Sequence, residues 1–145
     1  MIKVYRKTAT IKAEQFDGSD EMVKKYNITP PMPLDPDYTI NTLEGDMVLG
    51  VGDWVATGIK GEHWPIAGDV FKNTYAELPV IPKDVAEYID MEKNNTDVIQ
   101  AGIDAIEYSK GSIELTTWIE ENGDMFARAW LDGYQLEAQH DTRTD

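Results

Sequence analysis

The segment Pro79-Val80-Ile81-Pro82 divides the chain into two parts that differ in their hydrophobic periodicity. Before this segment, short apolar runs alternate with polar residues and are separated by Gly and Asp, which is typical of strands and turns. After it, apolar residues recur every three or four positions, which is typical of amphipathic helices. We therefore expect an α+β protein, with a β-rich domain over residues 1–80 and an acidic helical segment over residues 81–145.

Turn residues separate the apolar runs of the first part, so we expect a small antiparallel β meander or barrel-like sheet with one helix. Ser19 and Asp20 are suited to cap that helix. Four prolines in residues 30–37 exclude a helix or an inner strand there. The expected strands are residues 8–16, 38–43, 47–51, 54–59 and 74–78, the expected helix is residues 21–26, and Asp69 is expected to cap one helical turn over residues 69–71.

Four helices are expected in the second part, the first with Pro82 at its first position. We expect Thr96, Ser112 and Asp124 to cap the other three, and Lys110-Gly111 to end the second. The apolar faces of the four helices are expected to point into a core; they are Val85, Tyr88 and Ile89, then Ile99, Ile103 and Ile106, then Leu115, Trp118 and Ile119, and finally Phe126, Ala129, Trp130 and Gly133.

The chain has 145 residues, no cysteine and a net charge of −14. Disulfides, thiolate metal sites and cysteine nucleophiles are therefore excluded. Residues 81–145 hold 5 Lys/Arg and 15 Asp/Glu, a net charge of −10, whereas residues 1–80 hold 8 and 12, a net charge of −4. Because neutralising phosphates requires a basic surface, we expect no direct binding to nucleic acid. The acidic charge serves solubility, or it lets the protein compete for a basic groove on a partner.

The sequence also bears on where the protein works. No apolar run approaches the roughly 18 residues of a membrane span. No apolar signal core follows the basic residues near Met1. We therefore expect a cytoplasmic protein with no membrane partner.

The loop from Gly58 to Pro65 concentrates side chains that are able to bind a ligand. Its glycines allow a close approach of the backbone, Lys60 can meet a phosphate or carboxylate, and the tryptophans can stack on a base or ring. The spacing does not match a phosphate-binding loop. The alternative is a tight turn whose tryptophans pack in the core. The candidate ligand-binding residues are Trp54, Lys60, Gly61, Glu62, His63, Trp64 and Tyr75, and the expected ligand is a small anion such as a nucleotide.

Catalysis has weaker support in the sequence. His63 is one of two histidines and can act as a base or a metal ligand, with Asp53, Glu62 or Asp69 beside it. A site needs a constellation, however, and only one member is visible, so a structural histidine is the alternative. His140 lies in a polar tail and receives no role. We assign no catalytic residue, no metal site and no cofactor, and a small hydrolase using His63 stays an alternative.

The helical segment of the second part carries aromatic residues at helical spacing, which usually belong to a core. A segment of about 50 residues buries little surface by itself. It must pack on the β-rich domain, associate with another copy or dock on a partner, so a homo-oligomer is one expectation.

The first 80 residues contain, in order, Tyr5-Arg6-Lys7, Ala13-Glu14-Gln15-Phe16, Leu43-Glu44-Gly45, Gly52-Asp53-Trp54, the loop from Gly58 to Pro65, Asp69-Val70-Phe71 and Thr74-Tyr75-Ala76-Glu77. This order resembles small bacteriophage proteins of unknown function, which have a Gly-x-Lys-Gly-Glu-x-x-Pro loop and an Asp-x-Phe…Thr-Tyr-Glu ending. An extra alanine separates Tyr75 from Glu77 here, so the chain departs from that ending.

The string from Phe126 to Tyr134, Phe-Ala-Arg-Ala-Trp-Leu-Asp-Gly-Tyr, is similar to a second phage family of unknown function, found in phages and prophages of lactic acid bacteria. Neither family brings a known reaction. Both resemblances imply a phage or prophage accessory gene expressed in a Gram-positive host, and such genes often encode proteins that bind host machinery or defence components.

We therefore expect a non-enzymatic phage or prophage accessory protein that acts by binding in the cytoplasm of the host cell. The favoured partner is a host or phage protein that handles nucleic acid and is inhibited through the acidic surface. The alternatives are a pocket that sequesters a small anionic ligand, the small hydrolase, and a phage assembly component that self-associates through its helices.

Overall fold

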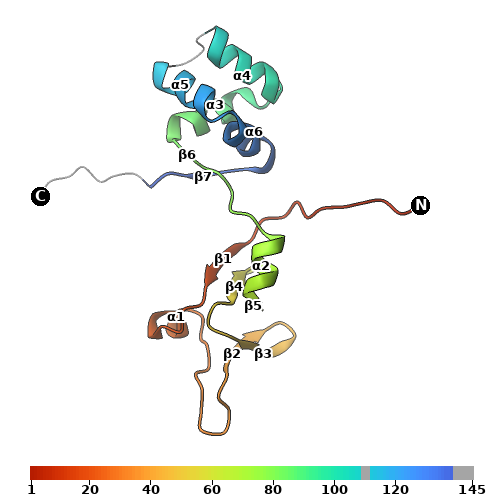
Figure 1. The fold of residues 1–145 in the computed structure, drawn as a ribbon, viewed down its shortest axis with the longest axis vertical. Helices are drawn as coiled ribbons and strands as arrows, with labels where there is room; N and C mark the ends of the chain where they lie inside the picture. Colours follow the sequence, from red (N-terminus) through yellow and green to blue (C-terminus); the bar gives the residue numbers. More distant parts are fainter. Residues whose placement is uncertain (109–111, 139–145) are drawn as a thin grey trace, which may run out of the picture. The chain divides into compact units, whose positions relative to one another are not determined.

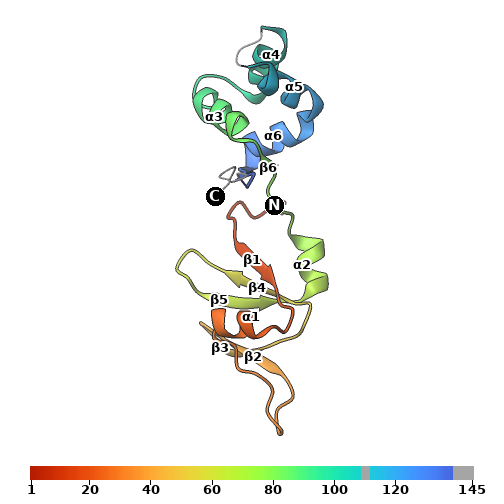
Figure 2. The ribbon, with the colours of Figure 1, turned by 90° about the vertical axis from the view of Figure 1, so that its left-hand side faces the viewer.

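The computed structural model of the chain describes residues 1–108 and 112–138. The chain divides into two compact units, Met1–Ala76 and Glu77–Asp145, and each is described by itself. Both units contain strands and helices, so the α+β class is confirmed, and the strands of the described residues form no closed barrel (Figures 1 and 2). Within the described residues, no helix is both long and apolar enough for a membrane crossing.

The first unit, residues 1–76, contains two small antiparallel sheets where the sequence predicted one continuous meander. In the larger sheet the central strand β4 (Trp54–Thr57) pairs with β1 (Lys12–Gln15) on one side and with β5 (His63–Ile66) on the other. The smaller sheet is a hairpin of β2 (Tyr38–Thr42) and β3 (Gly45–Leu49).

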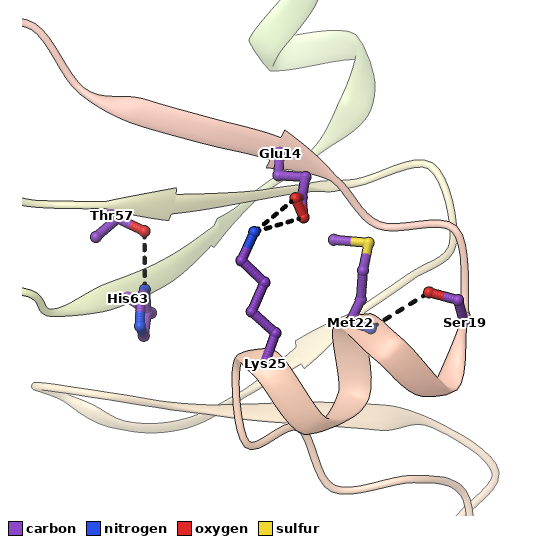
Figure 3. A network of polar contacts seen from close by, with 6 residues as sticks. All are labelled: Glu14, Ser19, Met22, Lys25, Thr57 and His63. Atoms are coloured by element: carbon purple, nitrogen blue, oxygen red, sulfur yellow. Dashed lines mark hydrogen bonds and ion pairs between the residues drawn. The ribbon is translucent and has the colours of Figure 1, made fainter. Parts of the chain in front are cut away.

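Helix α1 (Asp20–Lys25) closes the core of the first unit. As predicted, Ser19 caps it, because its side-chain oxygen accepts a hydrogen bond from the Met22 amide at 3.3 Å (Figure 3). An ion pair of 3.1 Å between Lys25 and Glu14 joins the end of α1 to β1 (Figure 3). The buried core of this unit consists of Phe16, Met22, Ile28, Ile40, Leu49 and Val55.

Several predictions for the first unit are wrong in detail. β1 is shorter than residues 8–16, and β5 lies where a loop was expected. Helix α2 (Gly68–Thr74) is longer than one turn, and Asp69 does not cap it, because the Asp69 carboxylate accepts a hydrogen bond from the next amide, that of Val70. Residues 74–78 form no strand, because Thr74 is still helical. Residues 30–37 contain no helix or sheet strand, as predicted, and form the protruding loop of Figure 1.

In its described residues the second unit has four helices (Figure 2) and one short parallel strand pair, β6 (Val80–Ile81) and β7 (Gln135–Leu136), which are labelled in Figure 1. Its core consists of Ile81, Val85, Ala86, Tyr88, Ile89, Ala101, Ala105, Leu115, Ile119, Phe126, Ala129 and Trp130. The helices are α3 (Lys83–Glu92), α4 (Val98–Glu107), α5 (Ile113–Glu121) and α6 (Gly123–Asp132).

The predicted caps of these helices are partly right. Ser112 caps α5, since its side-chain oxygen accepts a hydrogen bond from the Leu115 amide at 3.1 Å. Asp97, one residue after the predicted Thr96, caps α4. The cap position of α6 is Asn122 and not Asp124, and it makes no side-chain cap bond. Pro82 stands at the cap position of α3, one residue before the helix. The predicted end of α4 at Lys110-Gly111 lies outside the described residues.

Candidate functional site

In the candidate loop of the sequence, residues 58–65, the first five residues form the hairpin turn that joins β4 to β5, and the last three belong to β5. The Gly58 amide donates a hydrogen bond to the Glu62 carbonyl oxygen at 2.9 Å, and the Gly61 amide donates one to the Gly58 carbonyl oxygen at 3.1 Å. Gly61 has a φ of 80°, a conformation that favours glycine. Lys60 is exposed at the tip of this turn. Gly61 therefore has a geometric role in the turn.

The strand register separates His63 from Trp64. In β4 and β5, Thr57 pairs with His63 and Ala56 pairs with Trp64. Because successive side chains point to opposite faces of a sheet, His63 and Trp64 lie on opposite faces. His63 lies on the face of α1, where its ring meets the Tyr26 ring edge-on at 5.1 Å and its Nδ1 lies 3.0 Å from the Thr57 hydroxyl (Figure 3).

Two more candidates, Trp54 and Tyr75, belong to an aromatic stack that packs α2 on the sheet. The rings of Trp54 and Phe71 lie 4.0 Å apart and nearly parallel, and Tyr75 stacks on the other side of Phe71 at 5.1 Å. Lys7 Nζ lies 5.7 Å from the centre of the Tyr75 ring. Phe71 was not among the predicted site residues, although the sequence placed it in the same string as Asp69.

A pocket of about 330 Å³ lies along the edge of β5, between that strand and the β2–β3 hairpin. Of the seven candidates it contains Glu62, His63 and Trp64, and it does not contain Lys60 or Gly61. The opposite wall of the pocket, on the β2–β3 hairpin, was not predicted as part of a site. The Leu43-Glu44-Gly45 turn was the one sign of it in the sequence. The lining residues are Thr42, Leu43, Glu44, Met47, Glu62, His63, Trp64 and Pro65.

The acidic residues that were candidate partners of His63 are mostly engaged elsewhere. The two carboxylate oxygens of Asp53 accept hydrogen bonds from the amides of Gly50, at 2.8 Å, and Gly68, at 3.2 Å. Asp69 is exposed in the first turn of α2. Of these three candidates, only Glu62 lines the pocket together with His63. Among the described residues, no group of three His, Asp or Glu side chains is arranged to hold a metal ion.

The second unit, which we call the helical unit, has an apolar groove of about 350 Å³ that the sequence did not predict. Ile99, Ile103 and Ile106 of α4 line it, although the sequence predicted them in the core. Their exposed fractions are 73%, 37% and 39%, whereas Ala101 and Ala105 on the same helix are fully buried. We call these three residues the isoleucine stripe. The other lining residues are Val98, Gly102, Glu107, Ile119, Gly123, Phe126 and Ala127.

The alanines of α4 face the core because their small side chains let neighbouring groups reach the helix backbone. The Tyr88 hydroxyl donates a hydrogen bond to the Ala101 carbonyl oxygen at 2.8 Å, and the Thr116 hydroxyl donates one to the Ala105 carbonyl oxygen at 2.9 Å. The helix therefore has two apolar faces, and periodicity alone does not tell which one is buried.

Burial and nearby acids affect one titratable group of this core. Burial, and secondarily the charges of Glu92 and Asp104, raises the pKa of Tyr88 to about 12. The Tyr88 hydroxyl therefore stays protonated and keeps its hydrogen bond to α4 throughout the neutral pH range.

Residues 76–140 match a family of unknown function. The model of that family is described as "Protein of unknown function (DUF1642)", and its match covers the helical unit and less than half of the chain. No curated protein matches the chain, and no solved structure matches it either. The similarity therefore carries no reaction and no ligand to this chain. The predicted resemblance of residues 1–80 to a group of phage proteins stays a prediction.

Proposed function

We propose that the protein is a non-enzymatic phage or prophage accessory protein that works by binding a basic partner protein through the apolar groove of its helical unit. The observation that supports this most is the isoleucine stripe, an apolar helix face left exposed in a strongly acidic segment. Exposed apolar patches bordered by polar surface are typical of protein interaction sites.

The occupant that fits the groove is an amphipathic segment with apolar side chains on one face and Lys or Arg on the others. Three isoleucines along one side of α4 match the spacing at which a docked helix presents its anchors. Glu107 is the one charged residue that lines the groove among the described residues. Among the residues that the structure describes, no Lys or Arg lines the groove, so a basic segment meets no like charge from them.

Charge also argues against a second copy of this chain in the groove. Each copy carries a net charge of −14, and −10 of that lies in residues 81–145. Bringing two such surfaces together is opposed by repulsion that salt screens only beyond a Debye length of about 8 Å. A basic partner instead gains attraction from the same field, which raises the rate of encounter.

Proteins that handle nucleic acid present basic surfaces of this kind. The resemblance to phage families of unknown function supports an accessory role, and a host defence or nucleic-acid-handling protein in the host cytoplasm is the partner that this role favours. In this proposal the acidic helices compete with nucleic acid for the basic surface of the partner.

A defined peptide pair tests the groove. One peptide is a leucine–lysine helix of about four turns with its leucines on one face, and the other has the same composition in scrambled order. We expect the amphipathic peptide to bind at least about tenfold more tightly, a difference of about 1.4 kcal/mol. The preference should disappear in the Ile99→Ser/Ile103→Ser variant, which keeps every charge.

Equal binding of the two peptides to the parent protein would show that charge alone drives the interaction and would contradict the proposal. So would a stable dimer in sedimentation equilibrium that the double serine variant abolishes, because the groove would then be an interface between copies and the assembly role would be favoured.

The accessory role needs a second experiment with a natural partner. A protein captured from host cells should be purified, and its nucleic-acid binding measured with and without this protein. Inhibition by the parent and not by the double serine variant supports the proposal. A partner that binds both forms and nucleic acid at the same time would contradict it.

A further inference from the structure

The pocket between β5 and the β2–β3 hairpin has a charge pattern opposite to the one expected from sequence. Its described lining contains two carboxylates, Glu44 and Glu62, and no Lys or Arg. Lys60, which was expected to attract an anion, lies outside it. The acidic lining therefore disfavours an anionic ligand and favours a cation.

One atom of a residue that lines this pocket lacks the partner that its burial requires. The Oε2 oxygen of Glu62 is buried and makes no hydrogen bond with any described residue. Leaving a buried carboxylate oxygen without a donor is costly, because the water it has lost is not replaced. A ligand that brings hydrogen-bond donors and positive charge to this carboxylate would compensate that cost.

The rest of the pocket suits an aliphatic stem. Leu43, Met47 and Pro65 supply apolar surface, and the side chains of Leu43 and Met47 are 83% and 44% exposed, so they remain available to a ligand. Ammonium and guanidinium groups in proteins are carried on such stems, which lie along apolar surface while the head reaches a polar partner.

Local hydrogen bonds fix one wall of the pocket, and close packing on Gly58 places the other. The Thr42 hydroxyl donates to the Gly45 carbonyl oxygen at 2.7 Å and accepts from the Glu44 amide at 3.1 Å, which holds the Leu43-Glu44 turn. On the other wall the Glu62 carboxylate lies directly over Gly58, where a methyl group would occupy its position. The shape therefore exists before a ligand arrives, and this lowers the entropy lost on binding.

We propose that this pocket binds a primary ammonium or guanidinium group on an aliphatic stem, with Glu62 as the main counter-charge and Glu44 as the second. The group belongs either to a Lys or Arg side chain of a partner protein or to a free diamine or polyamine. This site lies in the first unit and does not depend on the groove of the helical unit.

The test follows the methyl signal of Met47 and the indole signal of Trp64 by NMR while ligands are added. The ligands are 1,5-diaminopentane, a capped Gly-Lys-Gly peptide, pentanol and pentanedioate. We expect at least one cation to shift these signals with a dissociation constant of about 1 mM or below, and the neutral and anionic ligands to bind at least about tenfold more weakly. The cation that binds identifies the source, a small molecule or a side chain.

Three variants separate this site from general attraction to an acidic protein. Glu62→Gln removes the charge and keeps the shape, and Gly58→Ala keeps the charge and displaces the carboxylate; each should weaken cation binding at least about tenfold. Asp69→Asn removes an exposed carboxylate outside the pocket and should bind as the parent does, and so should Ile99→Ser in the helical groove. Circular dichroism checks that each variant is folded.

The inference is overturned if neither cation shifts the pocket signals below about 10 mM, or if pentanedioate binds as well as the diamine. It is also overturned if Glu62→Gln and Asp69→Asn weaken binding equally. The leucine–lysine peptide also carries ammonium groups, so the groove is judged by its preference over the scrambled peptide, which has the same lysines. The two proposals can therefore fail independently.

Discussion

At the scale of single residues, Asp53 connects three parts of the first unit. Its two carboxylate oxygens accept hydrogen bonds from the amides of Gly50, which precedes the β3–β4 turn, and Gly68, which begins α2. Its own carbonyl oxygen accepts from the Phe16 amide at 2.8 Å. From the sequence, Asp53 was a candidate partner of His63 in catalysis. A carboxylate that can act in catalysis can equally accept hydrogen bonds from backbone amides.

We expect Asp53→Ala to lower the free energy of unfolding by about 2–3 kcal/mol, because two backbone amides lose a charged acceptor. Asp69→Ala is the control, since it removes an exposed carboxylate from the same segment and should change stability by less than about 0.5 kcal/mol. Urea unfolding measures both. Equal effects of the two substitutions would show that Asp53 does not hold the turn to α2.

Tyr88 makes stability sensitive to alkaline pH. Its pKa rises from 10.0 in the unfolded chain to about 12 in the fold, so the folded state keeps a proton that the unfolded state loses. The stabilisation is complete below pH 10 and is lost as the pH rises towards 12, by up to about 2–3 kcal/mol.

This pH dependence is measured by urea unfolding at intervals through that range, with Tyr88→Phe as the reference. The variant should be less stable at neutral pH, since the hydroxyl no longer donates to the Ala101 carbonyl oxygen. The gap between parent and variant should narrow above pH 10. A constant gap would mean that Tyr88 has an ordinary pKa in the fold.

At the scale of the elements, the start of α4 shows what sequence rules can and cannot locate. Thr96 and Asp97 are both good capping residues, and the sequence does not choose between them. In the structure the Asp97 carboxylate accepts a hydrogen bond from the Gln100 amide at 2.9 Å. The Thr96 amide instead donates to the Glu92 carbonyl oxygen, which ends the preceding helix.

Asp97→Ala should therefore cost about 1 kcal/mol of stability, the usual cost of losing a helix cap. Thr96→Ala, one residue away, should cost less than about 0.5 kcal/mol. Thermal unfolding followed by circular dichroism at the helix band compares the two. A larger loss of stability in the Thr96 variant would mean that Thr96 is the cap, as the sequence predicted.

Two isoleucines of the second unit, one buried and one exposed, give a second comparison. Ile99 is exposed in the groove, whereas Ile89 of α3 is buried in the core. We expect Ile89→Ala to cost about 2–5 kcal/mol through the cavity it leaves, and Ile99→Ser to cost less than about 0.5 kcal/mol. Denaturant unfolding tests this, and a large loss in the Ile99 variant would mean that the stripe is part of the folded core.

These elements also show why part of the structure was predictable. The predicted helix caps Ser19 and Ser112 are confirmed, because a cap depends on a few local atoms. The isoleucine stripe and β5 were misassigned because both depend on which neighbour a segment packs against, and periodicity does not contain that information. The walls of the pocket were not predicted for the same reason, since Met47 and Glu62 line one pocket only after two hairpins have formed.

At the scale of the whole molecule, both units have a buried core, but most of the net negative charge belongs to one of them. Each unit has a buried core of its own, one around Phe16 and Val55 and the other around Ile89 and Phe126. Most of the negative charge lies in residues 81–145. A protein built in this way can use the helical unit to recognise a basic partner while the first unit presents a separate pocket.

The most direct test of the central claim is an NMR titration of the isoleucine methyl groups with the amphipathic leucine–lysine peptide. We expect the signals of Ile99, Ile103 and Ile106 to shift together with one dissociation constant, which increases as salt is raised. The scrambled peptide, which carries the same lysines, should leave these three signals in place, and any shift of Ile40 or Ile66 in the first unit should be the same with both peptides. Shifts confined to the first unit, or no change in the isoleucine stripe at saturating amphipathic peptide, would contradict binding in the groove.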